Sequence, residues 1–328
     1  MDKIKATLKY VECCYRKLFG KKIKKLGDII LIKINKNKKK KSNKRNKRKK
    51  KIEKLKFCIK FICIIASFLF LKYFPFNFLD LEYLNLYIVA HKDFPNKLTN
   101  PYYKIICDNK TQLKNQYQIE IIEAYEDNEL FPKRIGYCEG LKIYYIWKKY
   151  KKKNISSKYV GFVHYRRVFD FKNKIPNLNK IFTQYDLIIN KRINFNITIK
   201  TQFANNHIGK FMDEIEEIIK ENFTEYYSYA EKFLNKNFFS CCNIFIMKQK
   251  DFIKYGEFVF GVLLEFDRRH NLKNDDDIKN LILLESKKQR IYNIEYQCRQ
   301  EAFLMERISS IFYDYYFKKM YEIGVTIQ

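Results

Sequence analysis

The 328-residue chain is 47% hydrophobic, which excludes a wholly disordered protein and allows the core of one large domain or two ordinary ones. Its net charge of +30 is concentrated at one end, because residues 1–56 carry 24 Lys and Arg against 4 Asp and Glu. This distribution argues against nucleic-acid binding by the chain as a whole, since the rest of the sequence is only moderately basic.

The basic segment 1–56 ends in a lysine-rich run without aromatic side chains. Such a run cannot bury enough apolar surface to fold alone, so we predict a solvated, disordered cytosolic tail, with an RNA-binding patch as the alternative. The next segment, 57–76, has the roughly 20 residues that cross a bilayer, and its lysines Lys60 and Lys72 lie near its ends.

Segment 57–76 therefore predicts a transmembrane signal anchor, with a buried helix packed on the following domain as the alternative. By the positive-inside rule the basic tail stays cytosolic and residues 80–328 lie on the other side of the membrane. We expect a single-pass membrane protein of the endoplasmic reticulum or Golgi with a lumenal domain. Four N-x-[ST] sequons are compatible with this orientation: Asn109, Asn154, Asn196 and Asn222.

From residue 84 onward, apolar runs alternate with helical patterns, which predicts one α/β domain over residues 84–328. We expect strands at 83–90, 159–163, 185–191 and within 240–252, the last followed by a turn. We expect helices at 136–150, 211–223, 252–270 and 301–320.

Polar side chains directly follow two of the expected strands. His91 and Lys92 follow one, and His164, Arg166 and Arg167 follow the other. In open α/β sheets ligands bind beyond the carboxyl ends of the strands, so we expect these side chains to converge. Arginine pairs with two phosphate oxygens at once and lysine adds a point charge, so the cluster predicts an anionic ligand.

Several motifs that mark other functions are absent from the sequence. No G-x-G-x-x-G, P-loop, G-x-S-x-G, H-E-x-x-H or C-x-x-C pattern occurs, which excludes the usual nucleotide fingerprints, two hydrolase classes and a zinc site. No D-x-D pair ends the strand at 159–163, so no metal ligands are predicted. The acidic run at 275–277 is expected to lie in a solvent-exposed loop.

Six blocks occur in the order of one known family: YIVAHKD, DNELFPKRIGYCEGLKIYYIWKK, YVGFVHYRRVF, YDLIINK, NIFIMKQKDF and RQEAFLMER. From about Leu86 to Phe317 the chain resembles the glycosyltransferase family of capsular and exopolysaccharide synthesis that is described as a domain of unknown function. Its mark is a strand ending in H-Y-R-R-[YV]-F. The resemblance implies a GT-A-like fold, in which a Rossmann-type mixed sheet flanked by helices binds a nucleotide-sugar.

The resemblance also implies roles for particular residues. The candidates for catalysis are Glu139, His164, Arg166 and Glu306. The candidates for nucleotide-sugar binding are Tyr87, His91, Lys92, Asp127, Asn128, Tyr137, Tyr165, Arg167, His207, Asn243 and Arg299. The His/Arg cluster stands where related enzymes carry D-x-D, so we expect it to hold the diphosphate and to require no metal cofactor. Either glutamate is a candidate for the acceptor base or for a sugar-hydroxyl ligand.

Each candidate has a structural alternative. Arg166 or Arg167 could pair with Glu139 or Glu306 as a buried ion pair, and Asn243 could cap a turn. The expected function is transfer of a sugar from a nucleotide-sugar donor to a glycan or polysaccharide acceptor. The alternative function is a membrane-tethered, non-catalytic binding protein whose basic arm holds anionic lipid or RNA.

Overall fold

The computed structural model describes residues 84–94, 102–113, 120–125, 128–171, 175–289 and 293–327. The predicted tail (1–56), the predicted anchor (57–76) and the candidate Asp127 lie outside the described residues. None of the helices in the described part of the chain is both long and apolar enough to span a membrane.

The described strands are β1 (Leu84–Val89), β2 (Tyr103–Cys107), β3 (Ile121–Glu123), β4 (Tyr159–His164), β5 (Arg167–Phe169), β6 (Leu187–Asn190), β7 (Ile193–Asn194), β8 (Phe238–Phe239), β9 (Phe245–Lys248), β10 (Met320–Ile323) and β11 (Val325–Ile327). The described helices are α4 (Arg134–Tyr137), α5 (Glu139–Lys151), α6 (Leu178–Ile181), α7 (Ile199–Asn206), α8 (Gly209–Asn222), α9 (Thr224–Leu234), α10 (Gln249–Arg269), α11 (Asp275–Gln289), α12 (Ile294–Gln297) and α13 (Gln300–Tyr316), with short 3-10 turns η2 (Lys110–Gln112) and η3 (Phe131–Lys133).

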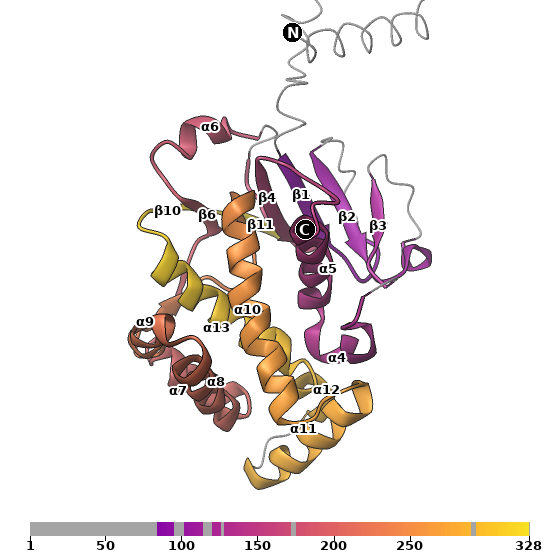
Figure 1. The fold of residues 1–328 in the computed structure, drawn as a ribbon, viewed down its shortest axis with the longest axis vertical. Helices are drawn as coiled ribbons and strands as arrows, with labels where there is room; N and C mark the ends of the chain where they lie inside the picture. The colour runs from indigo at the N-terminus through magenta and orange to yellow at the C-terminus, as the bar shows by residue number, and fades with distance from the viewer. Residues whose placement is uncertain are drawn as a thin grey trace, which may run out of the picture. The chain divides into compact units, whose positions relative to one another are not determined.

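Nine of the described strands form one mixed sheet with the order β10-β6-β9-β4-β1-β2-β3, to which β5 and β11 add an antiparallel extension (Figure 1). Strands β4, β1, β2 and β3 run parallel, and β9 is antiparallel to both β4 and β6. A separate two-stranded ribbon joins β7 and β8.

The order of the strands places a topological switch point between β1 and β4. The chain moves outward from β1 to β2 and β3, then returns to the opposite side of β1 as β4. Val89 of β1 is directly paired with His164 of β4, so the two strands end at the same level. Ligands of open α/β sheets bind at such a point.

Side-chain alternation along β4 explains why the sheet is buried on both faces. Val160 and Phe162 belong to the core beneath the long helices, whereas Tyr159 and Val163 belong to a second core on the opposite face. Gly161 is required between them, because an added Cβ atom would lie 2.7 Å from side-chain atoms of neighbouring strands.

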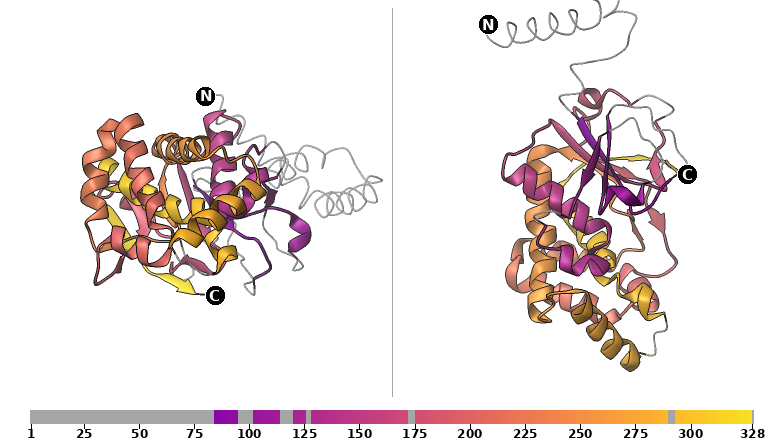
Figure 2. Two further views of the ribbon diagram at one scale, coloured as in Figure 1. Left: turned by 90° about the horizontal axis from the view of Figure 1, so that it is seen from below. Right: turned by 90° about the vertical axis from the view of Figure 1, so that its right-hand side faces the viewer.

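Helices α5, α10 and α13 pack together against one face of the sheet, with α7, α8 and α9 beside them (Figures 1 and 2). Trp147 of α5 lies against Gly256 of α10 and donates a hydrogen bond to the Ile253 carbonyl at 3.0 Å. Helices α11 and α12 lie at the end of this helical layer farthest from the sheet (Figures 1 and 2).

Several predicted element boundaries are wrong. The predicted helix at 136–150 is two helices, α4 and α5, because Cys138 between them has a positive φ of 47°. The predicted helix at 301–320 ends at Tyr316, after which the chain enters β10. Strand β9 leads directly into α10 without the predicted turn.

The acidic run at 275–277 also differs from its prediction, because it forms the first turn of α11 instead of a loop. Asp277 accepts backbone hydrogen bonds from Lys273 and Asn274, and Asp275 accepts one from Ile135. Carboxylates are favoured at a helix N-terminus, so this run is accounted for by capping.

Candidate active site

A tight hairpin, not a free strand end, presents the His-Tyr-Arg-Arg sequence. Strand β4 extends one residue beyond its prediction to His164, which pairs with Arg167 of β5 across the turn of Tyr165 and Arg166. By alternation His164 shares the face of Phe162, which is the face that the long helices cover. The Arg166 side chain is exposed, and its guanidinium lies 5.2 Å from the centre of the Tyr165 ring.

The ends of β1 and β4 meet as expected. The Tyr165 hydroxyl and the His91 Nε2 are 3.2 Å apart, and the two rings meet edge to face at 4.7 Å. The His91 and His164 ring centres are 6.4 Å apart. Lys92 follows His91 and is exposed.

Both histidines are held in their neutral form. Burial lowers the pKa of His164 to about 3, with further lowering by Arg166, His91 and Arg167. Desolvation also lowers the pKa of His91, and the positive charges of Lys142, Lys92 and Arg166 add to this effect. The fixed positive charge at this edge is therefore carried by arginine and lysine, not by imidazolium as first expected for His164.

A largely buried carboxyl group, that of Glu139, lies close to the basic side chains Arg299 and Lys142. Glu139 is the first residue of α5, and 13% of its side chain is exposed. Burial raises its pKa, and the charge of Glu306 raises it further, while Arg299 and Lys142 oppose the increase. The Arg299 Nη2 lies 4.0 Å from the Glu139 Oε2.

Glu306 of α13 is hydrogen-bonded through both of its oxygens. Its Oε1 accepts a hydrogen bond from the Cys242 amide at 2.8 Å, and its Oε2 accepts one from Arg307 at 2.9 Å. The carboxylate thus stabilises the turn before β9, where Cys242 and Asn243 have positive φ values of 69° and 48°. Neither residue is glycine, so the backbone of this turn is strained.

Arg167 and Asn243 flank the same turn. The Arg167 Nη1 donates to the Cys242 Sγ at 3.3 Å. Asn243 is buried and its Oδ1 accepts a hydrogen bond from Ser309, while its Nδ2 has no hydrogen-bond partner among the described residues. Among the described residues the predicted alternative, an ion pair from Arg166 or Arg167 to a glutamate, does not form.

Three candidate residues lie in the core, away from this cluster. Tyr87 is buried and its ring stacks on Phe162 at 5.2 Å. Tyr137 is fully buried and donates a hydrogen bond to Asp267 at 2.7 Å. The Asn128 side chain bonds to the backbone of its own turn, donating to the Ala124 carbonyl at 2.8 Å and accepting from the Leu130 amide at 3.1 Å. All three side chains therefore make contacts within the protein, and their predicted role in binding stays a prediction.

His207 is also buried, between aromatic rings. Its imidazole stacks on Phe303 at 4.1 Å, and its Nδ1 lies 3.3 Å from the Gln297 Oε1. Burial lowers its pKa to about 4, with a smaller lowering by Arg307. The side chain packs α7 against α12 and α13.

A family model described as a domain of unknown function (DUF4422) matches residues 85–283, more than half of the chain. The chain belongs to the DUF4422 family. The matched range contains β1, β4 and the start of α5, and thus His91, Glu139 and the hairpin of His164. Arg299 and Glu306 lie beyond it.

Among solved structures, this DUF4422 chain is similar to the apo form of WbbM, a bifunctional glycosyltransferase, with 19% identity and a TM-score of 0.56. The alignment covers 75% of this chain and 45% of WbbM, so the chain spans less than half of that protein. The likeness shows the fold alone, and the structure confirms the predicted α/β class, a mixed sheet flanked by helices.

A weaker match is core-mannan synthase A (CmsA/Ktr4) from Aspergillus fumigatus in a Mn/GDP form. It has 11% identity and a TM-score of 0.26 over 70% of this chain and 69% of that chain, and a TM-score this low does not show a shared fold. A search of curated proteins finds no match to the DUF4422 sequence.

Sequence reasoning missed one residue of the DUF4422 cluster. Lys142 is buried one turn after Glu139 in α5, and its Nζ lies 2.6 Å from Asp108, which follows β2. Its charge acts on both His91 and Glu139. The sequence did contain a signal for this pair. Asp108, the partner of Lys142, directly follows the apolar run of β2, which was not recognised as a strand.

Proposed function

We propose that this DUF4422 chain is a glycosyltransferase that transfers a sugar from a nucleotide-sugar donor to a glycan or polysaccharide acceptor. The observation that carries the proposal is that the same two cations, Lys142 and Arg299, act on the largely buried Glu139 carboxyl and on His91, which follows β1 at the switch point between β1 and β4. The fold shared with WbbM supports the same class.

Arg166 and Arg299 are assigned to the donor diphosphate. Both charges act on His91 and His164, so both lie near the crevice at the strand ends. Guanidinium groups fixed where the leaving diphosphate gains charge stabilise it without rearrangement. The neutral imidazoles each offer one N–H donor and one acceptor for the sugar or the phosphates.

Glu139 is assigned as the base that takes the proton of the acceptor hydroxyl. A carboxylate with a raised pKa is a stronger base than an ordinary one, and Glu139 has this property because of burial and the Glu306 charge. Glu306 is a positioning residue, since its oxygens hold Cys242 and Arg307.

We also propose that transfer proceeds without a metal cofactor. Within the described ranges, no group of three His, Cys, Asp or Glu side chains is arranged to hold a metal ion. The side chains at the end of β4 are arginines, which can take the place of a cation at the diphosphate.

The direct test measures sugar release or transfer from a panel of nucleotide-sugars. We expect at least one donor to turn over, and Arg166→Ala to reduce the rate about 100-fold or more. Arg268→Ala is the matched control, because Arg268 is an exposed arginine on α10 and should retain full activity. Activity should persist in excess EDTA. Complete loss of activity that Mn²⁺ restores would contradict the metal-free mechanism. If no donor is turned over, the proposal that the chain is a glycosyltransferase is contradicted.

The location of the enzyme is a further part of the proposal: segment 57–76 anchors the chain, and the catalytic domain faces the lumen of the endoplasmic reticulum or Golgi. Asn154 and Asn196 both lie in sequons and are exposed. We expect both to be glycosylated in eukaryotic cells, with a mass loss after glycosidase treatment that Asn154→Gln and Asn196→Gln abolish. If neither asparagine is glycosylated when the chain is expressed in eukaryotic cells, the proposed lumenal location is contradicted.

A further inference from the structure

A surface hollow lies apart from the candidate active site. It has a volume of about 340 Å³ and is formed by the end of α9, the loop to β8, the end of α13 and the chain into β10. We call it the α9/α13 cleft, and its lining residues are Arg192, Tyr229, Lys232, Lys236, Asp314, Phe317, Lys318 and Met320. None of them belongs to the site around Glu139. The volume is within the usual range for small-molecule sites.

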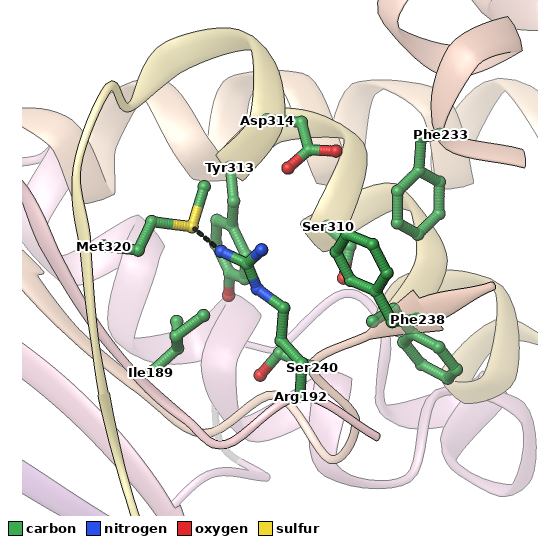
Figure 3. Close-up of a pocket in the computed structure, with 10 residues that line it drawn as sticks. Ile189, Arg192, Phe233, Phe238, Ser240, Ser310, Tyr313, Asp314 and Met320 are labelled. Carbon is green, nitrogen blue, oxygen red and sulfur yellow. Dashed lines mark hydrogen bonds between the residues drawn. The ribbon is translucent and has the colours of Figure 1, made fainter. Parts of the chain in front are cut away.

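The α9/α13 cleft continues inward to a much smaller cavity of about 10 Å³, which shares Arg192, Asp314 and Met320 with it. Figure 3 shows the Arg192 side chain extending across this inner cavity toward Met320, with Asp314 and Phe238 around it. The guanidinium donates to the Met320 sulfur at 3.2 Å, and it lies 5.5 Å from the centre of the Phe238 ring. A cation fixed by packing in this way forms the floor of the cleft.

Basic side chains outnumber acidic ones around the α9/α13 cleft. Lys236 pairs with Asp314 at 2.5 Å, and Arg192 pairs with Glu322 at 3.3 Å. Lys232 and Lys318 also line it, and neither forms an ion pair with any acidic side chain of the described residues. The hollow therefore has positive charge left over for an anion.

Aromatic rings accompany these cations. Tyr229 is 38% exposed at the cleft, and the Lys232 ammonium lies 5.8 Å from the centre of its ring. Phe317 lines the same hollow. The C–H face of a sugar ring is apolar, so an exposed aromatic ring beside hydrogen-bonding cations matches a saccharide that also carries negative charge.

We propose that the α9/α13 cleft binds an anionic saccharide, one that carries a carboxylate or a phosphate, and serves as the acceptor-side subsite of the enzyme. This inference rests on the proposed function for its acceptor role, but not for the binding itself. Lys232 and Lys318 contact the anionic group, and Tyr229 packs on the sugar ring. The acceptor glycan is thereby assigned a chemical class: it is acidic.

The test is calorimetric titration of the full chain with two probes, a glucuronic acid oligosaccharide and glucose 1-phosphate. These separate a carboxylate ligand from a phosphate ligand. We expect at least one to bind, and the double variant Lys232→Glu/Lys318→Glu to weaken it about tenfold or more, because two attractions become repulsions. Both lysines are on the surface, so the melting temperature should stay within a few degrees of wild type.

Further variants test whether binding takes place in the α9/α13 cleft. Lys220→Glu reverses an exposed lysine at the end of α8, outside the lining, and should leave probe affinity unchanged. The basic segment 1–56 is present in every variant, so only differences between variants report on the cleft. A third variant, Tyr229→Ala, should weaken the saccharide probes but not inorganic phosphate.

Equal affinity of wild type and the double variant would overturn the proposal, as would binding of a neutral oligosaccharide as tightly as the acidic one. Nucleotide-sugar binding should be the same in the double variant and in wild type. If that donor binding is absent from wild type while the acidic probe still binds in the cleft, the proposed enzyme function fails and the binding site remains.

Discussion

Arginine, not histidine, supplies the charge of the candidate site. Desolvation and neighbouring cations lower the pKa of both imidazoles, that of His164 to about 3, whereas Arg166 offers a guanidinium at the same edge of the sheet. An anionic ligand would reverse part of this effect, because a nearby negative charge favours imidazolium. Glu139 is the carboxyl group of this site whose pKa is raised, first by burial and then by the charge of Glu306.

If Glu139 is the acceptor base, only its ionised form is active. The rate should fall as the pH decreases through its pKa, with a midpoint above the ordinary glutamate value of 4.5. Glu139→Gln should lower kcat about 100-fold or more while donor affinity changes little. Steady-state rates between pH 4.5 and 8 provide the measurement.

Glu306→Gln is the companion variant for this prediction. It keeps an oxygen for the Cys242 amide but removes the charge that raises the pKa of Glu139, so the acidic midpoint should move to lower pH. A Glu139→Gln enzyme with normal kcat, or a midpoint that is the same in the Glu306 variant, would show that Glu139 is not the base.

The junction of η3, α4 and α10 contains a buried ionic group that the sequence did not reveal. Lys133 and Asp267 are both buried and form an ion pair, and Tyr137 donates a second hydrogen bond to the same carboxylate. Glu301 of α13 lies beside them, and burial raises its pKa to about 8, with Asp267 adding to the increase. Glu301 is therefore mainly protonated at pH 7.

Breaking this ion pair should cost stability. Asp267→Asn leaves the Lys133 ammonium buried without a counter-charge and should lower the free energy of unfolding by about 3–5 kcal/mol. The double variant Lys133→Met/Asp267→Leu should recover most of the loss. Urea unfolding monitored by circular dichroism at pH 7 is the measurement.

Glu301→Gln is the control for the buried pair, because it replaces a carboxyl that is already mainly neutral at pH 7. It should change the free energy of unfolding much less than Asp267→Asn does. If Asp267→Asn unfolds with the same free energy as wild type, the Lys133–Asp267 pair does not stabilise the junction.

The sequence predicted those elements that have local signals. Apolar runs located β1, β4, β6 and β9, and helical periodicity located α8, α10 and most of α13. Strand β11 was not predicted, because the pairing between Val325 and Phe169 is a long-range contact without a local pattern. The local β4–β5 hairpin, which pairs His164 with Arg167, was not predicted either. The split between α4 and α5 was missed because Cys138, with its positive φ, is a residue type that rarely adopts that conformation.

The strand pattern alone predicted the residues at the ends of β1 and β4, whereas Glu139, Arg299 and Glu306 were predicted only from the family resemblance. His91 and His164 lie at these strand ends, and parallel pairing of β1 with β4 brings them together. The burial of Tyr87 and Tyr137 could not be predicted from the sequence, because it depends on which way each side chain points in the fold. The hydrogen bond from the Asn128 amide to the Ala124 carbonyl was not predicted either.

At the scale of the whole molecule, function depends on where the excess charge lies. Most of the net charge of +30 belongs to residues 1–56, yet the charge assigned to chemistry is the small group at the switch point between β1 and β4. A second group of basic side chains lines the α9/α13 cleft, and none of the residues that line this cleft belongs to the candidate active site. The proposed donor site therefore lies at the switch point between β1 and β4, and the proposed acceptor site lies in the α9/α13 cleft.

Binding of a nucleotide-sugar to the full chain tests the central claim most directly. A ligand that binds only the folded state raises the melting temperature, so a panel of UDP-, GDP-, CDP- and dTDP-sugars can be screened by thermal unfolding. The account predicts an increase of several degrees for at least one donor at millimolar concentration, and a much smaller increase for Arg166→Ala. If no donor shifts the melting temperature of the wild-type chain, the claim that it uses a nucleotide-sugar is contradicted.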